Sequence, residues 1–96
     1  LQGLVFVESN FYTKFGEIDL IFFEKSSQTL VFVEVKYRRN DFFGSAIEMV
    51  TEEKQNRIFA SSQVYLLKKN WDRNVRYDII GVSKGSGNIE WLKNAF

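Results

Sequence analysis

The stretch FGEIDLIFFEKSSQTLVFVEVKYRR, residues 15–39, decides the fold of this chain. Two runs rich in β-branched and aromatic residues, 17–24 and 29–37, flank the polar connection KSSQ at 25–28. Such runs around a short polar segment predict a β-hairpin. Charged residues nevertheless interrupt both strands where the pattern predicts buried or half-buried side chains, and these residues are Glu17, Asp19, Glu34 and Lys36.

The hairpin connection fixes which residues face one another. A loop of two residues (26–27) or of four gives the same register, in which Asp19 lies opposite Glu34 and Glu17 lies opposite Lys36. Because side chains alternate between the faces of a strand, all four point to one side, at one end of the hairpin. Opposed Cβ atoms lie roughly 4.5–5.5 Å apart. Two opposed carboxylates at that distance repel each other unless a cation lies between them.

The remaining hairpin positions predict two apolar faces. The charged face continues as core through Ile21, Phe23, Leu30 and Phe32. The opposite face is expected to be apolar throughout, with Ile18, Leu20, Phe22, Val31, Val33 and Val35.

Mg²⁺ or Mn²⁺ is the cation that the residue types favour. The chain contains no His and no Cys, which excludes a Ser-His-Asp triad, His-based acid–base catalysis and metal sites built on thiolate or imidazole. Hard divalent cations take carboxylate oxygens instead. Lys36 would lie beside such a metal, where it could orient or deprotonate an attacking water or neutralise charge on a phosphate.

A purely structural interpretation is a cross-strand salt bridge between Glu17 and Lys36. Glu-x-Lys on a strand is common and needs no function. Asp19 opposite Glu34 argues against this interpretation, because like charges across a strand pair are destabilising and a fold that keeps them needs a reason.

The rest of the chain predicts an α/β fold with a mixed sheet. Further strands are expected at 4–9, 76–82 and 88–92, with a turn over 10–14. Residues 38–44 are predicted to form a loop, and residues 45–50 a helical turn. The resulting order, β-β-β-α-β-β, is typical of a sheet with a helix packed against it.

One long helix follows the hairpin. Thr51 has the character of an N-cap, with Glu52 and Glu53 complementing the helix dipole, and the helix should run to about Lys69. Its inner side is predicted to carry Ile58, Val64 or Tyr65, and Leu67, with Ala60 allowing close packing. In the strand that follows, Asp78 is a candidate for structural hydrogen bonding.

Composition bounds the class of protein. With 96 residues, 45% of them hydrophobic and 17% aromatic, the chain should form a single globular domain over residues 1–96. No apolar run approaches a membrane span and no signal peptide is visible, so a membrane partner is not expected. The lack of Cys fits a cytoplasmic location. Residues 1–35 carry two basic against five acidic side chains and residues 36–76 nine against five. This asymmetry fits a metal site beside a phosphate-binding surface, and it fits a solvated face of mixed charge equally well.

Several segments of the sequence closely resemble a known family. Asp19, then Glu34-Val35-Lys36, resembles the PD-(D/E)XK pattern of restriction-endonuclease-like nucleases. The longer segments FGEIDLI, LVFVEVKYRR, EEKQNRI, YDIIGV and IEWLKNAF together resemble the YraN-type family, small bacterial proteins of uncharacterised function related to Holliday-junction resolvases. The resemblance runs from about Asn10 to Phe96.

This resemblance implies a restriction-endonuclease-like core and a set of site residues. Asp19 and Glu34 match the metal ligands and Lys36 the catalytic lysine. Glu17 falls in the Gly-Glu-Ile-Asp stretch of the family, as an outer-sphere group or a partner of Lys36. Gln55 resembles a helix glutamine that reaches toward the active site in related nucleases.

The resemblance also implies an N-terminal family helix that this sequence does not contain. Without that helix we expect the site to be one carboxylate short and one face of the sheet to be uncovered. The expected consequences are weak or absent activity and self-association through the exposed surface. Resolvases act as dimers, so a homodimer is one arrangement that the resemblance suggests.

Basic residues near the proposed site make nucleic acid the leading partner, with DNA favoured over RNA. A phosphodiester backbone could be held, without sequence reading, by Arg38, Arg39, Lys54 and Arg57. The leading hypothesis is a Mg²⁺- or Mn²⁺-dependent endonuclease acting on DNA. The alternatives are a nucleic-acid-binding module that keeps the nuclease fold without cleaving, and a small interaction domain whose charges form an ion-pair network.

Overall fold

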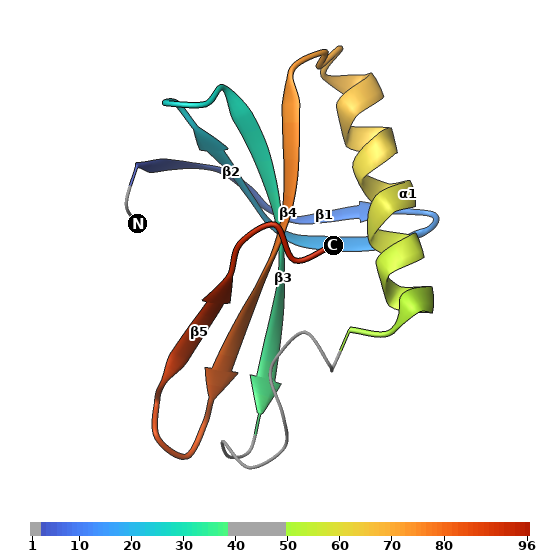
Figure 1. The fold of residues 1–96 in the computed structure, drawn as a ribbon. Coiled ribbons are helices and arrows are strands. Elements are labelled where there is room, and N and C mark those ends of the chain that lie inside the picture. The colour runs from blue at the N-terminus through green and yellow to red at the C-terminus, as the bar shows by residue number, and fades with distance from the viewer. Residues whose placement is uncertain (1–2, 39–49) are drawn as a thin grey trace.

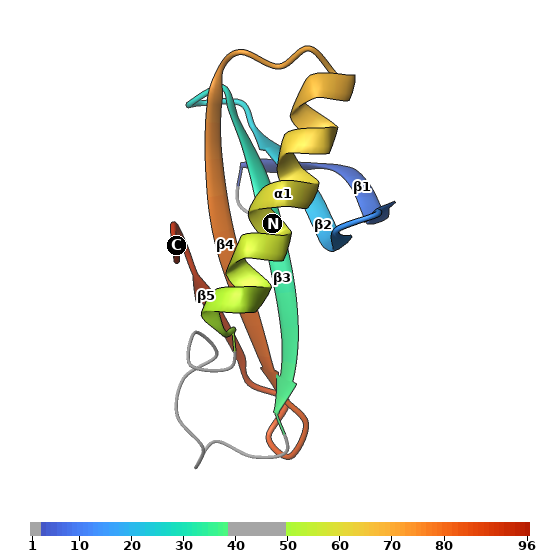
Figure 2. The ribbon, with the colours of Figure 1, turned by 90° about the vertical axis from the view of Figure 1, so that its right-hand side faces the viewer.

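A computed structural model describes residues 3–38 and 50–96. These residues form a five-stranded sheet with one α-helix against one face (Figures 1 and 2). The elements, in chain order, are β1 (Leu4–Thr13), β2 (Gly16–Glu24), β3 (Thr29–Arg38), α1 (Glu52–Lys68), β4 (Asn74–Ser83) and β5 (Ile89–Leu92). The predicted α/β class and the order β-β-β-α-β-β are confirmed. Of the predicted loop at 38–44 and helical turn at 45–50, residues 39–49 lie outside the described residues, and Arg38 belongs to β3.

The strands lie in the sheet in chain order, β1-β2-β3-β4-β5. β3 and β4 are parallel, and every other neighbouring pair is antiparallel. Two parallel strands need a long crossover, and α1 supplies it. The helix runs back along the sheet, so its first turn lies toward the end at which β3 finishes (Figure 1). This topology brings the start of α1 near the charged end of the hairpin.

β1 is longer than the sequence pattern predicted. The turn expected over residues 10–14 is confined to the residues between Thr13 and Gly16, because β1 continues to Thr13 and pairs with β2 along its whole length. The pairing is irregular, with a register shift between Phe6 and Glu8. Asn10 adopts a positive φ of 54° inside the strand, a conformation that Asn tolerates better than most residues.

Two apolar clusters lie on opposite faces of the sheet. The larger cluster contains the helix residues Ile58 and Tyr65 together with strand residues that include Ile21, Phe32 and Ile79. The smaller cluster consists of Phe22, Val31, Val33 and Ile80, with Leu20, Val35 and Trp91 packed against it. The predicted faces are confirmed except at Ile18, which belongs to the helix-side cluster.

α1 begins and ends close to the predicted residues but packs differently. The Thr51 hydroxyl accepts the amide of Lys54 at 3.1 Å, which confirms the N-cap. Ile58 and Tyr65 are buried as predicted, whereas Leu67 is 81% exposed, so that prediction was wrong. Ser61 and Ser62 occupy the inner face instead and are fully buried. They fit there because Ser61 bonds Thr13 (2.9 Å) and Ser62 bonds Tyr77 (2.6 Å) through their hydroxyls.

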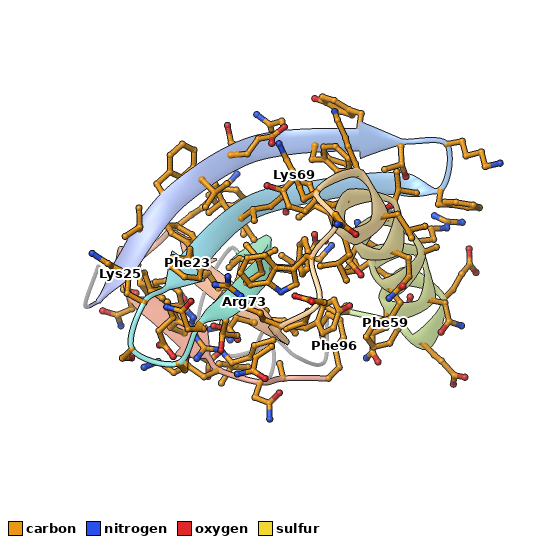
Figure 3. All side chains as sticks on the ribbon, turned by 90° about the horizontal axis from the view of Figure 1, so that it is seen from above. Phe23, Lys25, Phe59, Lys69, Arg73 and Phe96 are labelled. Carbon is orange, nitrogen blue, oxygen red and sulfur yellow. The ribbon has the colours of Figure 1, made fainter. Side chains whose placement is uncertain are left out.

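The C-terminal segment closes the helix-side core. The amide of Ala95 donates to the carbonyl of Tyr77 at 2.7 Å. This bond brings the ring of Phe96 into a stacked contact with Tyr77 and an edge contact with Phe59. Phe59 and Phe96 lie close together between the helix and the sheet in Figure 3.

Asp78 organises the opposite side of β4, and the predicted structural role is confirmed. Its carboxylate is fully buried and accepts two bonds from the Arg76 guanidinium, at 2.9 and 3.0 Å. It also accepts the indole N–H of Trp91 and the amide of Asn94, each at 2.9 Å. One carboxylate thus connects β4, β5 and the C-terminal segment.

We predict that Asp78→Ala strongly destabilises the fold. The change leaves the Trp91 indole N–H without its acceptor and leaves the Arg76 guanidinium with Glu24 as its remaining carboxylate partner. Breaking a buried ion pair typically costs about 3–5 kcal/mol. Urea unfolding followed by tryptophan fluorescence measures the loss. The control is Asp72→Ala at an exposed position, which should change the unfolding free energy by less than about 0.5 kcal/mol. A loss at Asp78 as small as that of the control would contradict the assignment.

Candidate functional site

The hairpin register follows the prediction over its paired part. β2 and β3 pair from Glu24–Thr29 to Leu20–Val33. The ladder then stops, one residue before Asp19 and Glu34 would face each other. The two carboxylates therefore lie where the two strands begin to separate, and the space between them is not filled by backbone pairing.

Asp19 lies at an irregularity of β2. Its Oδ2 accepts the amide of Val35 at 2.8 Å, so a side chain satisfies the first β3 amide beyond the paired part. On the other side, the β1 register pairs Ser9 with Leu20 and Phe11 with Ile18, which puts the positive-φ residue Asn10 across from Asp19. The buried face of β2 changes at this point, and this change explains why Ile18 packs against the helix.

Glu34 is the most enclosed charge of the site. The residue is 4% exposed, on a strand surrounded by core. Its Oε2 lies 3.1 Å from the Lys54 ammonium and 3.5 Å from the Lys36 ammonium. Burial raises the pKa of Glu34, the neighbouring Asp19 carboxylate raises it further, and Lys54 partly opposes this effect. In return, the Glu34 carboxylate raises the pKa of Lys54.

A small pocket of about 100 Å³ lies between the hairpin and the first turns of α1. Its walls come from β2, β3 and α1, and its lining residues are Gly16, Glu17, Asp19, Glu34, Lys54, Arg57 and Ile58. Gly16 adopts a φ of 149°, which favours glycine and turns the chain into β2. Three carboxylates and two basic side chains therefore line one cavity.

Glu17 and Lys36 are arranged differently from the predicted cross-strand pair. Lys36 pairs with Glu34 on its own strand. Glu17 faces Tyr12 across β1 and β2, and a hydrogen bond to Glu17 raises the pKa of the Tyr12 hydroxyl. Both charged residues stay near the pocket without a direct pair between them.

The remaining predicted site residues do not all line the pocket. Arg57 lines the pocket and pairs with Glu53 one turn back on the helix. Gln55 donates to the carbonyl of Val50 at 3.2 Å, so its amide supports the helix start and is not part of the pocket lining. Arg38, on β3, lies 3.4 Å from the Ser83 hydroxyl and 3.8 Å from the Glu90 carboxylate. Arg39 lies outside the described residues.

The donor set suits a hard divalent cation. Within residues 3–38 and 50–96, no three acidic side chains converge closely enough to hold a metal by themselves. Asp19 and Glu34 supply two carboxylates in one pocket, and Asp19 keeps Oδ1 beside the Oδ2 that bonds Val35. Mg²⁺ commonly binds through one or two carboxylates and keeps water or phosphate as its other ligands. The cation position beside Glu34 already attracts two ammonium groups.

The direct contact between Lys54 and Glu34 is the feature that the sequence analysis missed. Nineteen residues lie between them, so no local pattern relates the two side chains. The topology offers a signal, because the helix of a β-α-β unit starts near the carboxyl end of the preceding strand. A lysine in the first helical turn could have been placed near Glu34 by that rule.

Comparisons with known proteins identify relatives over nearly the whole chain. A family model described as "Uncharacterised protein family UPF0102" matches residues 1–82. A UPF0102 protein of Vibrio parahaemolyticus is 47% identical over 96 residues, which cover 98% of this chain and 78% of that protein. A UPF0102 protein of Nitrosococcus oceani is 42% identical over 99 residues, with 99% and 78% covered. One from Mannheimia succiniciproducens is 38% identical over 96 residues, with 97% and 79% covered.

We predict that Glu34 makes the metal-free protein less stable as the pH rises. Its folded-state pKa lies above the ordinary value of 4.5, so between these two values Glu34 binds more protons in the folded protein than in the unfolded chain. The contribution of Glu34 to stability is therefore greatest below pH 4.5 and declines as the pH rises through the folded pKa. Glu34→Gln should remove this part of the decline. Urea unfolding in a chelator, from about pH 4 to about pH 8, measures it.

Glu52→Gln, at an exposed position in the first turn of α1, is the matched control. The difference in unfolding free energy between Glu34→Gln and the wild type should grow with pH, while the control difference stays level. If the difference in unfolding free energy between Glu34→Gln and the wild type stays constant or shrinks as the pH rises, the pKa of Glu34 is not raised in the folded protein.

Proposed function

The chain belongs to the uncharacterised protein family UPF0102, and we propose that it is a metal-dependent phosphodiesterase acting on DNA. The family name assigns no reaction, so the proposal rests on the chemistry of the pocket. Within residues 3–38 and 50–96, no helix is both long and apolar enough to cross a membrane.

The observation that carries the proposal is the enclosure of Glu34 beside Asp19. A carboxylate that is 4% exposed loses most of its hydration, and the second carboxylate in the pocket adds repulsion. Both effects disfavour the charged pair unless cations neutralise it. A carboxylate with a raised pKa in a cleft is a common mark of functional sites, and Glu34 stands with Asp19 where β2 and β3 stop pairing.

Four charged residues in and beside the pocket each have a defined part in the proposed reaction. Asp19 and Glu34 would hold Mg²⁺ or Mn²⁺, which when bound supplies Lewis-acid activation of a phosphodiester and lowers the pKa of a water. The Lys36 ammonium, 3.5 Å from Glu34, is positioned to orient the attacking water or to stabilise negative charge on the phosphate. Glu17 borders the pocket and can accept a proton from water at the rim.

Basic side chains around the pocket suit a polyanionic substrate. Lys54 and Arg57 line it from α1, with side chains 41% and 59% exposed. On β3, Arg38 faces the same side as Lys36, but its side chain is only 11% exposed and lies against Ser83 and Glu90, so Lys54 and Arg57 are the accessible contacts. Contacts of this type bind the phosphate backbone without reading sequence. The resemblance to Holliday-junction resolvases supports DNA as the polyanion.

A nucleic-acid-binding module without cleavage is the second candidate. The observation that favours it is the pair of ammonium groups already placed on Glu34. They neutralise the buried carboxylate without a metal, so the fold is satisfied in a state that has no catalytic cation. In this case the basic side chains around the pocket would bind nucleic acid without a catalytic metal.

We predict metal-dependent nicking of DNA that Asp19→Ala and Lys36→Ala each reduce by at least about 100-fold, the lower range for loss of a positioned acid–base group. Supercoiled plasmid, single-stranded DNA and a branched junction, each with Mn²⁺ and with chelator, are suitable substrates. Lys93→Ala, at an exposed position after β5, is the control that should retain wild-type cleavage.

Two results would count against the proposed DNA-cleaving function. DNA binding that weakens with salt, with no cleavage by the wild type, would support the binding module. Nicking that persists equally in Asp19→Ala, Lys36→Ala and the wild type would mean that the activity does not come from this pocket, and would overturn the proposal.

A further inference from the structure

The ion pair between Lys54 and Glu34 joins an accessible cation to an inaccessible anion. The Lys54 side chain is 41% exposed, whereas that of Glu34 is 4% exposed, and the ammonium lies 3.1 Å from Oε2. The lysine therefore reaches the carboxylate from the solvent side of the pocket. Lys36 contacts the same oxygen at a longer distance, 3.5 Å, and its side chain is less exposed, at 23%.

The backbone of Lys54 is held by the N-cap, whereas its side chain is held over the pocket by the ion pair with Glu34. Its amide is bonded to the N-cap hydroxyl of Thr51 at 3.1 Å, so the backbone is held at the first helical turn. The first turn of a helix disfavours a cation, because the dipole is positive at that end. Glu34 is thus the interaction that holds the ammonium over the pocket, and the flexible lysine stem can release it.

A divalent cation and the Lys54 ammonium compete for one place. Asp19 and Glu34 provide two carboxylates, and two ammonium groups already approach Glu34 Oε2. A dication bound there would lie within a few ångströms of both ammonium groups, and like charges at such distances repel strongly where water is excluded. The Lys54 side chain is the more exposed of the two, so its ammonium is the one that can move away from Glu34.

We propose that Lys54 is a displaceable counterion that occupies the cation position beside Glu34 until a divalent metal binds, and that the released ammonium then binds a substrate phosphate. The inference rests on the proposed function and adds a coupling between the binding of the metal and the binding of a substrate phosphate. Metal binding frees a phosphate contact, and by reciprocity phosphate binding at Lys54 favours metal binding. The pocket therefore becomes receptive to a phosphodiester once the metal is in place.

Calorimetric titration of the full 96-residue chain with Mn²⁺ tests the competition. Lys54→Met keeps the aliphatic stem but removes the charge, and it should bind Mn²⁺ at least about 5-fold more tightly than the wild type, the lower end of typical coupling factors. Lys54→Arg keeps the charge and should return the affinity toward that of the wild type. Lys25→Met, in the exposed turn between β2 and β3, should leave it unchanged.

A second titration tests the release. A single-stranded DNA oligonucleotide is bound with Mn²⁺ and with chelator, and the ratio of the two affinities measures the coupling. The ratio should be smaller for Lys54→Met than for the wild type, because the variant has no ammonium to release. Thermal unfolding in chelator shows that each variant is folded before it is titrated.

The outcomes separate this inference from the proposed function. Unchanged or weaker Mn²⁺ binding by Lys54→Met, with binding still abolished by Glu34→Gln, would overturn the counterion role and leave the metal site standing. If the wild type binds no Mn²⁺, the proposed function falls and this inference falls with it. A purely structural ion pair would lower the stability of Lys54→Met without changing its Mn²⁺ affinity, which also contradicts the inference.

Discussion

The buried Glu34 carboxylate is the constraint on which the rest of the site depends. It lies on β3, the strand held by β2 on one side and by β4 on the other, and only 4% of the residue is exposed. A charge in that position must be neutralised, and the fold does so from two directions, with Lys36 on the same strand and Lys54 on the helix. The contact with Lys54 connects the start of α1 to the sheet. The same enclosure makes the carboxylate costly to ionise without a cation beside it, which is why we propose a divalent cation as its partner.

The sequence predicted the hairpin well because its signals are local. The polar connection fixed the register, which the pairs from Glu24–Thr29 to Leu20–Val33 confirm. The N-cap at Thr51 followed from side-chain chemistry in the same way. The end of the ladder could not be predicted, because it depends on Asp19 bonding the Val35 amide and on the positive φ of Asn10 across from it. Alternation alone placed Ile18 on the wrong face for that reason.

Long-range contacts account for the other misses. Ser61 and Ser62 were not among the residues predicted for the inner side of the helix, and partners on β1 and β4 allow both serines to be buried there. Leu67 reads as core and lies in solvent, since the inner face of α1 is filled by Ile58, Tyr65 and the two serines. Lys54 read as a substrate contact, and the structure gives it Glu34 as its partner. For Ser61, Ser62 and Lys54 the deciding neighbour is distant in sequence, so residue type and spacing do not predict the contact.

Paramagnetic broadening by Mn²⁺ tests the central claim, a divalent cation site at Asp19 and Glu34, most directly. In a ¹⁵N-labelled sample, trace Mn²⁺ should first broaden the amide signals of Val35 and Lys36 on β3 and of Lys54 on α1, because these residues surround the two carboxylates. The same addition to Glu34→Gln should leave those signals sharp. Broadening centred on the exposed acidic turn at Glu52 and Glu53, or equal broadening in both proteins, would contradict the account.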